Sequence, residues 1–301
     1  MPIPNSILVI NGKGGVLKTS MASHLAGLAA AAEWDVLIID ADGQGNLSRD
    51  LGYQPDGGVA LAKAISGEAP LVAVADRRPH LHYVSGGSAI DDAIAKASSD
   101  MSQGRTGAVR AIDRALAPIC DQYHLVVIDS PPREMLLRRM LLAATRFFVV
   151  PTSVDATGID GIADVLETVQ EVREDLNPTL EMLGVAIGPV GTQAKVVREE
   201  TRSEIASLLG DPDLVFKTMI RHAPAIARAC REQGLLTTEY EVEAAQAAAK
   251  RKSYWKMTEA ERAADKRTKK YSSAAEGLAG DWQQLVNEVM SRFQERQGAE
   301  R

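Results

Sequence analysis

The sequence lacks any apolar run long enough to cross a membrane. No stretch of about 18 apolar residues occurs in the chain, whereas a membrane-spanning helix needs about 20. Residues 1–5 also lack the basic region and apolar stretch that mark a signal peptide. We therefore expect no membrane segment. We also expect no N-terminal helix-turn-helix domain, because the first strand-like run starts near the N-terminus.

Cysteine and aromatic residues are scarce. Cys120 and Cys230 are far apart and lack metal-ligand spacing, which is typical of reduced, packed thiols. Aromatic residues make up 4% of the chain although hydrophobic residues make up 45%, so Ala, Leu, Val and Ile must fill the core. The 301 residues are enough for one large α/β domain.

Charge is unevenly distributed along the chain. The formal net charge is −6, yet nine Lys or Arg stand against three acidic residues between Lys250 and Lys270. The net charge argues against a protein that coats nucleic acid with its whole surface. The basic segment remains a candidate contact for an anionic partner.

Short apolar runs rich in β-branched residues alternate with helical patterns. Such runs are typical of strands buried on both faces, and they lie at residues 7–10, 36–39, 81–84, 125–128, 147–150 and 183–187. Between the first two, Met21, Leu25 and Leu28 recur at helical spacing. Strand, helix and strand in this order predict an α/β fold with a mostly parallel twisted sheet flanked by helices.

A glycine-rich loop separates the first predicted strand from the first predicted helix. Its glycines let backbone N–H groups turn toward phosphate oxygens, and the helix N-terminus adds partial positive charge. Lys18 is placed to reach the β- and γ-phosphates, and the Thr19 hydroxyl to ligate Mg²⁺. The predicted nucleotide-binding residues of this P-loop are Gly12, Lys13, Gly14, Gly15, Val16, Leu17, Lys18, Thr19 and Ser20.

Carboxylates follow two of the predicted strands. The carboxyl ends of parallel strands border the ligand crevice, so we expect Asp42 to position an attacking water. Asp40 is expected to contact the nucleotide site and to support Mg²⁺ or Lys18. Asp129 is expected to hold Mg²⁺ through a water, and Pro131 to stiffen a turn that senses the γ-phosphate.

These motifs together resemble the ParA family of deviant Walker-A P-loop ATPases. Residues 13–19 are similar to the family's phosphate loop, residues 40–46 to its switch I, and residues 126–132 to its Walker-B and switch II segment. The resemblance implies ATP and Mg²⁺ as cofactors and an ATP-dependent homodimer in which Lys13 reaches the partner's phosphates. It also implies weak ATP hydrolysis with three catalytic residues, Lys13, Lys18 and Asp42.

The resemblance further implies partners and a location. ParA proteins bind nonspecific DNA and act with a ParB-like centromere-binding protein. We therefore expect a cytoplasmic, nucleoid-associated protein that drives plasmid, phage or chromosome partition without a membrane. Nonspecific DNA binding needs Lys and Arg side chains that face phosphates. The candidates are Lys195, Arg198, Arg202, Arg221, Arg228, Arg231, Lys250, Arg251 and Lys252.

Two residues depart from the family pattern. Leu17 stands where the usual P-loop has glycine, and Gly43 stands where switch I usually has proline. We expect the Leu17 side chain to turn into the core at a modest cost in nucleotide affinity. The departures leave a nonhydrolysing scaffold that recruits a partner as an alternative function. A MinD-like membrane-cycling ATPase is another, although its last helix should have a basic polar face.

The chain is predicted to have three parts. Residues 1–238 form the ATPase core, and residues 239–271 form a charged helical insert rich in Ala, Lys, Arg and Glu. Residues 272–301 form a C-terminal helix. Its apolar stripe, which includes Trp282 and Phe293, predicts packing against the core.

Overall fold

The structure is a computed structural model that describes residues 1–132, 134–191, 195–254 and 275–299, with the side chains at 156, 195, 248–254, 275 and 276 outside that description. The eight strands are β1 (Ile3–Val9), β2 (Val36–Asp40), β3 (Val74–Ala75), β4 (Leu81–Val84), β5 (Leu125–Asp129), β6 (Thr145–Thr152), β7 (Glu181–Val190) and β8 (Val215–Arg221). They form one sheet in the order β3-β4-β2-β5-β1-β6-β7-β8. All neighbouring strands are parallel except β3 and β4.

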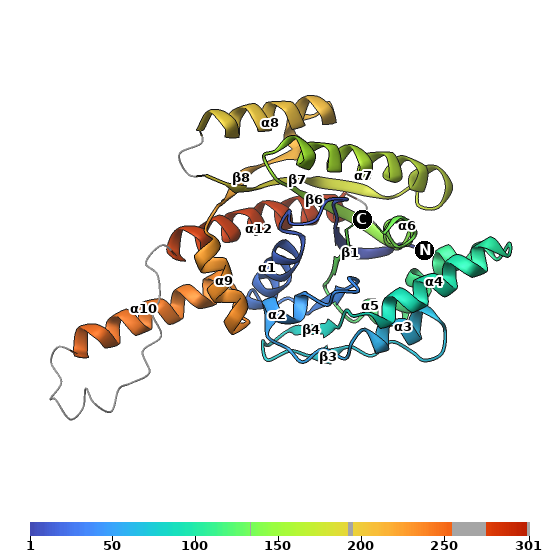
Figure 1. Ribbon diagram of the computed structural model, residues 1–301, viewed down its shortest axis with the longest axis horizontal. Helices are drawn as coiled ribbons and strands as arrows, with labels where there is room; N and C mark the ends of the chain where they lie inside the picture. Colours follow the sequence, from blue (N-terminus) through green and yellow to red (C-terminus); the bar gives the residue numbers. More distant parts are fainter. Residues whose placement is uncertain (133, 192–194, 255–274, 300–301) are drawn as a thin grey trace.

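Helices cover both faces of the sheet (Figure 1). One face carries α1 (Lys18–Ala31), α2 (Leu47–Leu51), α9 (Pro224–Gln233), the start of α10 (Thr237–Tyr254), and α12 (Ala275–Gly298). The other carries α3 (Val59–Ile65), α4 (Ala89–Ser102), α5 (Ala111–Cys120), α6 (Met135–Ala144), α7 (Ala156–Asp175) and α8 (Lys195–Leu209). Two 3₁₀ turns, η1 (Thr106–Arg110) and η2 (Pro212–Leu214), complete the described elements.

The two helical layers explain why the central strands contain runs that are apolar at consecutive positions. In β1, Leu8 packs into the core on one face, whereas Ile7 and Val9 pack into the core on the other. A strand covered on both sides has no position for a solvated side chain. The predicted α/β fold with its parallel sheet is therefore confirmed, and each of the six predicted runs lies within or overlaps a strand. The edge strands β3 and β8 were not predicted.

The C-terminal part of the chain packs on the core as its apolar stripe predicts. Trp282, Leu285, Val289 and Phe293 of α12 are buried against the same face as α1. Helix α10 starts at Thr237 and extends away from the body of the sheet (Figure 1). Of the basic segment, residues 250–254 lie at the end of α10, and residues 255–270 lie outside the described residues.

Two sequence expectations concern membranes and cysteines. Among the helices that the structure describes, none is long and apolar enough to cross a membrane. Cys120 and Cys230 are both free and buried, as the expectation of packed thiols requires.

Candidate functional site

The predicted phosphate loop lies between the carboxyl end of β1 and the first turn of α1. Gly15 has a positive φ of 77°, and a Cβ there would meet no atom within 4 Å. Leu17 also takes the left-handed region, with φ 64° and ψ 19°. Its side chain is half-buried and packs toward Gly188, at the end of β7. The side chain thus turns to the core, and the backbone adopts the conformation that glycine favours.

The two lysines of the loop are held differently. Lys18 is buried, and its ammonium donates to the Lys13 carbonyl at 2.6 Å. Burial lowers the pKa of Lys18, while the Asp129 and Asp42 carboxylates oppose that shift. A buried ammonium satisfied by one backbone carbonyl is well placed for an anionic ligand.

Lys13 points away from the loop to the N-terminus of α7. Its Nζ contacts the Asp155 carboxylate at 2.6 Å, the Ser153 hydroxyl at 3.3 Å and the Thr157 hydroxyl. The Lys13 ammonium is the largest cause of the lowered pKa of Asp155. In this form Lys13 is therefore paired within its own chain.

Asp40 and Asp42 organise the loop that follows β2. Asp40 accepts from the backbone N–H groups of Asp42 at 2.9 Å and Leu47 at 3.1 Å, so its oxygens hold the loop. Burial raises the pKa of Asp40 to about 7, although those two hydrogen bonds oppose the rise. Asp42 lines the central cavity and accepts from the Gln44 N–H at 2.9 Å.

Asp129 is the most unusual carboxylate of the site. It pairs in register with Asp40 across β5 and β2 and is fully buried. Within the described residues, neither oxygen has a partner at hydrogen-bond geometry. Burial and then the Asp40 carboxylate raise the pKa of Asp129, whereas the nearby Thr19 hydroxyl and Lys18 ammonium oppose the rise. A buried carboxylate without a partner is costly unless a cation or proton neutralises it.

Gly43 has a steric reason that the sequence did not reveal. A Cβ at position 43 would lie 2.4 Å from Oδ1 of Asp91, which stands in the first turn of α4. A proline there would displace that carboxylate. The loop after β2 therefore passes close to the Asp91 carboxylate at the position where the family usually has a proline.

A cavity of about 660 Å³ joins these groups to the C-terminal helices. The predicted nucleotide-site residues that line it are Gly14, Gly15, Leu17, Lys18, Thr19, Ser20 and Asp42, and the predicted DNA-binding residues that line it are Arg221, Arg228 and Arg231. Pro132 lines it rather than Pro131, and Gly12, Lys13, Val16, Asp40 and Asp129 lie outside its lining. Its apolar lining includes Ile220 of β8 and Leu278 and Trp282 of α12. The roles assigned to these residues from the sequence remain predictions.

Comparison with known proteins identifies the family. A family profile described as an AAA domain matches residues 5–182. The chain is 31% identical over 223 residues to the chromosome-partitioning ATPase Soj of Thermus thermophilus, covering 74% of this chain and 83% of Soj. The chain belongs to the ParA family of P-loop ATPases.

Two further proteins are similar to this ParA-family chain, one in sequence and one in fold. It is 30% identical over 231 residues to the cell division protein PomZ of Myxococcus xanthus, covering 75% of this chain and 69% of PomZ. The fold of cobyrinic acid a,c-diamide synthase from Mycobacterium smegmatis, solved with bound ATP analog and magnesium, gives a TM-score of 0.65 at 22% identity. That match covers 89% of this chain and 99% of the synthase. At this identity the likeness shows the fold alone.

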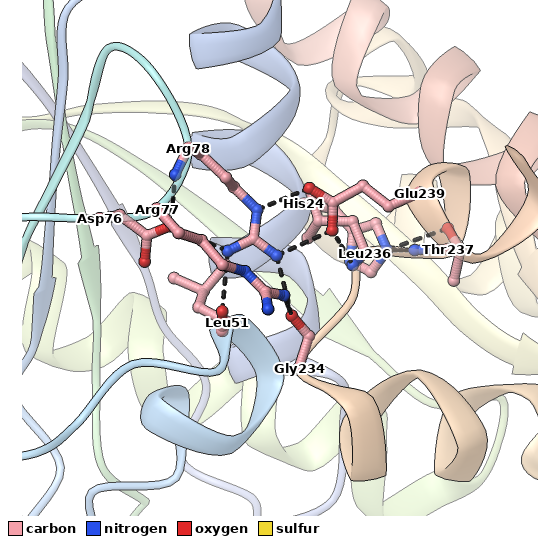
Figure 2. A network of polar contacts seen from close by, with 9 residues as sticks. All are labelled: His24, Leu51, Asp76, Arg77, Arg78, Gly234, Leu236, Thr237 and Glu239. Carbon is pink, nitrogen blue, oxygen red and sulfur yellow. Dashed lines mark hydrogen bonds and ion pairs between the residues drawn. The ribbon is translucent and has the colours of Figure 1, made fainter. Parts of the chain in front are cut away.

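Sequence reasoning missed a polar network that joins the ParA-type core to α10 (Figure 2). The Nε2 atom of His24 accepts from the backbone N–H of Thr237 at 3.2 Å, so Nδ1 carries the proton and donates to the Ser20 carbonyl at 2.7 Å. His24 also stacks on Trp282, with ring centroids 4.4 Å apart. Burial lowers the pKa of His24 to about 4. A lone histidine in a helix gave no signal of this contact.

Arg78 fixes the same junction from the other side (Figure 2). Its guanidinium donates to both oxygens of Glu239, at 2.7 and 2.8 Å, and to the Leu51 carbonyl at 2.8 Å. Glu239 in turn accepts from the Leu236 N–H at 2.8 Å, which caps the first turn of α10. The start of α10 is therefore tied to α1 and α2, which flank the phosphate loop and the loop after β2.

The arginines predicted to bind DNA lie on several elements of this ParA-family chain, and three of them, Arg221, Arg228 and Arg231, line the central cavity. Arg198 and Arg202 of α8 donate to atoms of β8. Arg221 pairs with Asp281 and Arg231 with Asp50, at 2.7 and 3.0 Å. Arg228 has a side chain 82% exposed and a loose pair with Glu232 at 4.0 Å. The side chains of Lys195, Lys250, Arg251 and Lys252 lie outside the described part of the chain.

Proposed function

We propose that this chain binds ATP with Mg²⁺ and hydrolyses it slowly. The observation that carries the proposal is the buried Asp129 carboxylate, which has no hydrogen-bond partner within the described residues and lies beside Lys18 and Thr19. Mg²⁺ prefers oxygen ligands and keeps several waters when phosphates share its coordination. The donor set therefore fits Mg²⁺, with Thr19 as a ligand, Asp129 acting through a water and Asp40 supporting the site.

Each residue of the site would have its own role in ATP hydrolysis. Lys18 would exchange the Lys13 carbonyl for phosphate oxygens and stabilise the charge that develops on them. Mg²⁺, when bound, would neutralise phosphate charge. Asp42 lines the same cavity and would orient the attacking water, while Asp40 keeps the Asp42 backbone in place. Backbone N–H groups of residues 12–20 would complete the phosphate contacts.

We also propose an ATP-dependent homodimer. Lys13 would leave Asp155 and reach the phosphates of the partner subunit, as the family resemblance implies. Lys13 must then give up hydrogen bonds to the Ser153 and Thr157 hydroxyls and a half-exposed ion pair with Asp155. An ion pair of this kind contributes little to stability, typically ~1 kcal/mol or less. Nucleotide binding can therefore offset the loss of this contact.

The cellular role that we propose is DNA partition. Soj, a relative over most of its length, is a chromosome-partitioning ATPase. We propose that the protein acts in the cytoplasm at the nucleoid with a ParB-like partner and nonspecific DNA. The candidate DNA contacts are Arg228, an exposed residue of the ATPase core of residues 1–238, and the charged insert at 239–271. The helix at 272–301 would serve as support for that core.

A phosphate-release assay with Mg²⁺-ATP, with and without DNA, tests the proposal. The wild type should turn over slowly, and Asp42→Ala should bind ATP without turnover. Light scattering should then find a nucleotide-dependent dimer of the Asp42→Ala protein that is lost when Lys13→Ala is added. ATP binding without any turnover in the wild type would favour the scaffold alternative. Absence of ATP binding would refute the proposed function.

A further inference from the structure

Arg138 is a buried arginine that no motif explains. It lies in the second turn of α6, which begins at Met135 directly after the segment that contains Asp129 and Pro132. Its exposure is 7%. Within the described residues its side chain makes one hydrogen bond, a long one of 3.4 Å from Nη1 to the Asp164 carbonyl, and no ion pair within 4.0 Å. A buried guanidinium with five donors usually finds more partners.

The Arg138 guanidinium lies against the back of the phosphate loop. A Cβ at Gly12 would lie 2.8 Å from Nη2 of Arg138, so glycine is needed there to admit the guanidinium. The Arg138 charge also acts on Lys18, whose pKa it helps to lower. Two buried cations therefore meet at one loop. Burial lowers the pKa of Arg138, and the Asp164 carboxylate opposes that shift without forming an ion pair within 4.0 Å in the described part of the chain.

We propose that Arg138 is a positioning residue whose charge completes the anion-binding potential of the phosphate loop and favours the more highly charged nucleotide, ATP over ADP. The proposal rests on the proposed function, because it needs a nucleotide in the loop. Arg138 does not line the cavity, so it acts through the loop backbone and through space. An anion in the loop offsets the repulsion between Lys18 and Arg138, and each added negative charge offsets more of it. Because α6 follows the Asp129 segment, the same contact links that segment to the loop.

The chain offers a matched control next to this residue. Arg139 is on the same helix and pairs with Glu171 of α7 at 3.0 Å on the surface. An exposed pair of this kind contributes little to stability and faces away from the loop. Arg139→Met therefore removes the same charge from the same helix without touching Gly12.

The test combines thermal unfolding of the ligand-free proteins with calorimetric titration of Mg²⁺-ATP and Mg²⁺-ADP. Arg138→Met keeps the aliphatic stem and removes the charge. We expect its ligand-free melting temperature to equal or exceed that of the wild type, because an unpaired buried charge is gone. We expect its dissociation constant to rise ~tenfold for ATP and ~threefold for ADP. Arg138→Lys should keep most of the preference for ATP, and Arg139→Met should match the wild type.

Two results would overturn the inference while leaving the proposed function intact. A lower ligand-free melting temperature with equal losses for ATP and ADP would show that Arg138 only packs. Unchanged affinities in Arg138→Met would show that its charge does not reach the ligand. If the wild type itself binds neither nucleotide, the proposed function fails and the inference fails with it.

Discussion

Replacement of Leu17 by glycine should leave the ligand-free protein nearly as stable as the wild type, because two effects of similar size oppose each other. Leu17 has φ 64°, in the left-handed region, which costs a residue with a Cβ about 1–2 kcal/mol. Glycine removes that cost. It also removes a half-buried side chain, worth about 1 kcal/mol, and adds roughly 0.5–1 kcal/mol of unfolded-state entropy. The net change should stay within about 1 kcal/mol of zero.

Two further variants separate these contributions. Leu17→Ala loses the packing toward Gly188 but keeps the backbone strain, so it should be less stable than Leu17→Gly by about 1 kcal/mol. Gly15 has φ 77° and open space around its Cβ position. Gly15→Ala therefore measures the strain without any loss of packing, less the gain from a less flexible unfolded chain, and should cost about 0.5–1 kcal/mol.

Urea unfolding of the ligand-free proteins measures all four stabilities. The expected order is wild type and Leu17→Gly together, with Leu17→Ala below both. The loop backbone already has the geometry that glycine would adopt, so ATP affinity should rise by no more than ~threefold in Leu17→Gly. Leu17→Gly less stable than Leu17→Ala would refute the left-handed conformation. A gain in affinity above tenfold would show that the side chain obstructs the nucleotide.

Three other predictions follow from the contacts of the site. Asp155→Ala frees Lys13, so light scattering with ATP should find the dimer at a several-fold lower protein concentration; an unchanged dimer affinity would mean that Lys13 does not exchange partners. Asp129→Asn should raise the ligand-free melting temperature, because burying the Asp129 carboxyl without a hydrogen-bond partner among the described residues costs free energy whether it is ionised or takes up a proton, and should weaken Mg²⁺-dependent ATP binding; a fall in the melting temperature would contradict this account of Asp129. The pKa of His24 is lowered to about 4 in the folded protein, whereas in the unfolded chain it is near 6.5. As pH falls from 6.5 to 4, the unfolded chain therefore takes up a proton at His24 before the folded protein does, and the contribution of neutral His24 to stability is lost. The free energy of unfolding of the wild type should fall relative to His24→Gln by about 3 kcal/mol between pH 6.5 and 4, and parallel profiles would show that His24 is not buried in its neutral form.

The centre of the fold could be predicted from the sequence, whereas its edges could not. Residues 36–39 and 125–128 are apolar at every position because helices cover both faces of the sheet, and few environments besides a doubly covered strand favour such a short, continuous apolar run. The edge strand β8 has no continuous apolar run, because Lys217 and Thr218 separate its two buried apolar pairs, Val215–Phe216 and Met219–Ile220. The backbone of β8 is also bound by Glu288 of α12, whose carboxylate accepts from the Lys217 N–H at 2.7 Å. No short window of sequence contains that partnership.

The candidate site, like the fold, has one part that a continuous sequence motif predicts and another part that depends on contacts with distant residues. Residues 11–20 are continuous in sequence, so their spacing is enough to predict a loop between a strand and a helix. The partners of Lys13 and Gly12 come from α7 and α6, more than a hundred residues away. Residue type alone does not distinguish Arg138, which touches the loop, from Arg139, which faces Glu171. Which of the two arginines faces the loop depends on their positions around α6, and those positions depend on the residue at which α6 begins.

The two lysines of the phosphate loop differ in how easily they can exchange their present partners, and this difference bears on the proposed function. Lys18 is buried and bound to a backbone carbonyl, which an anion can replace without leaving a charge unpaired. Lys13 is bound to Asp155, so its departure leaves a carboxylate that is 57% exposed and readily solvated. The first step, nucleotide binding, therefore needs only the chain's own residues. The proposed second step, release of Lys13 from Asp155, costs little free energy, so contacts between two subunits would be enough to drive it. Under the proposed function, a chain with this arrangement would hold ATP as a monomer and would place its second lysine only when a partner subunit arrives.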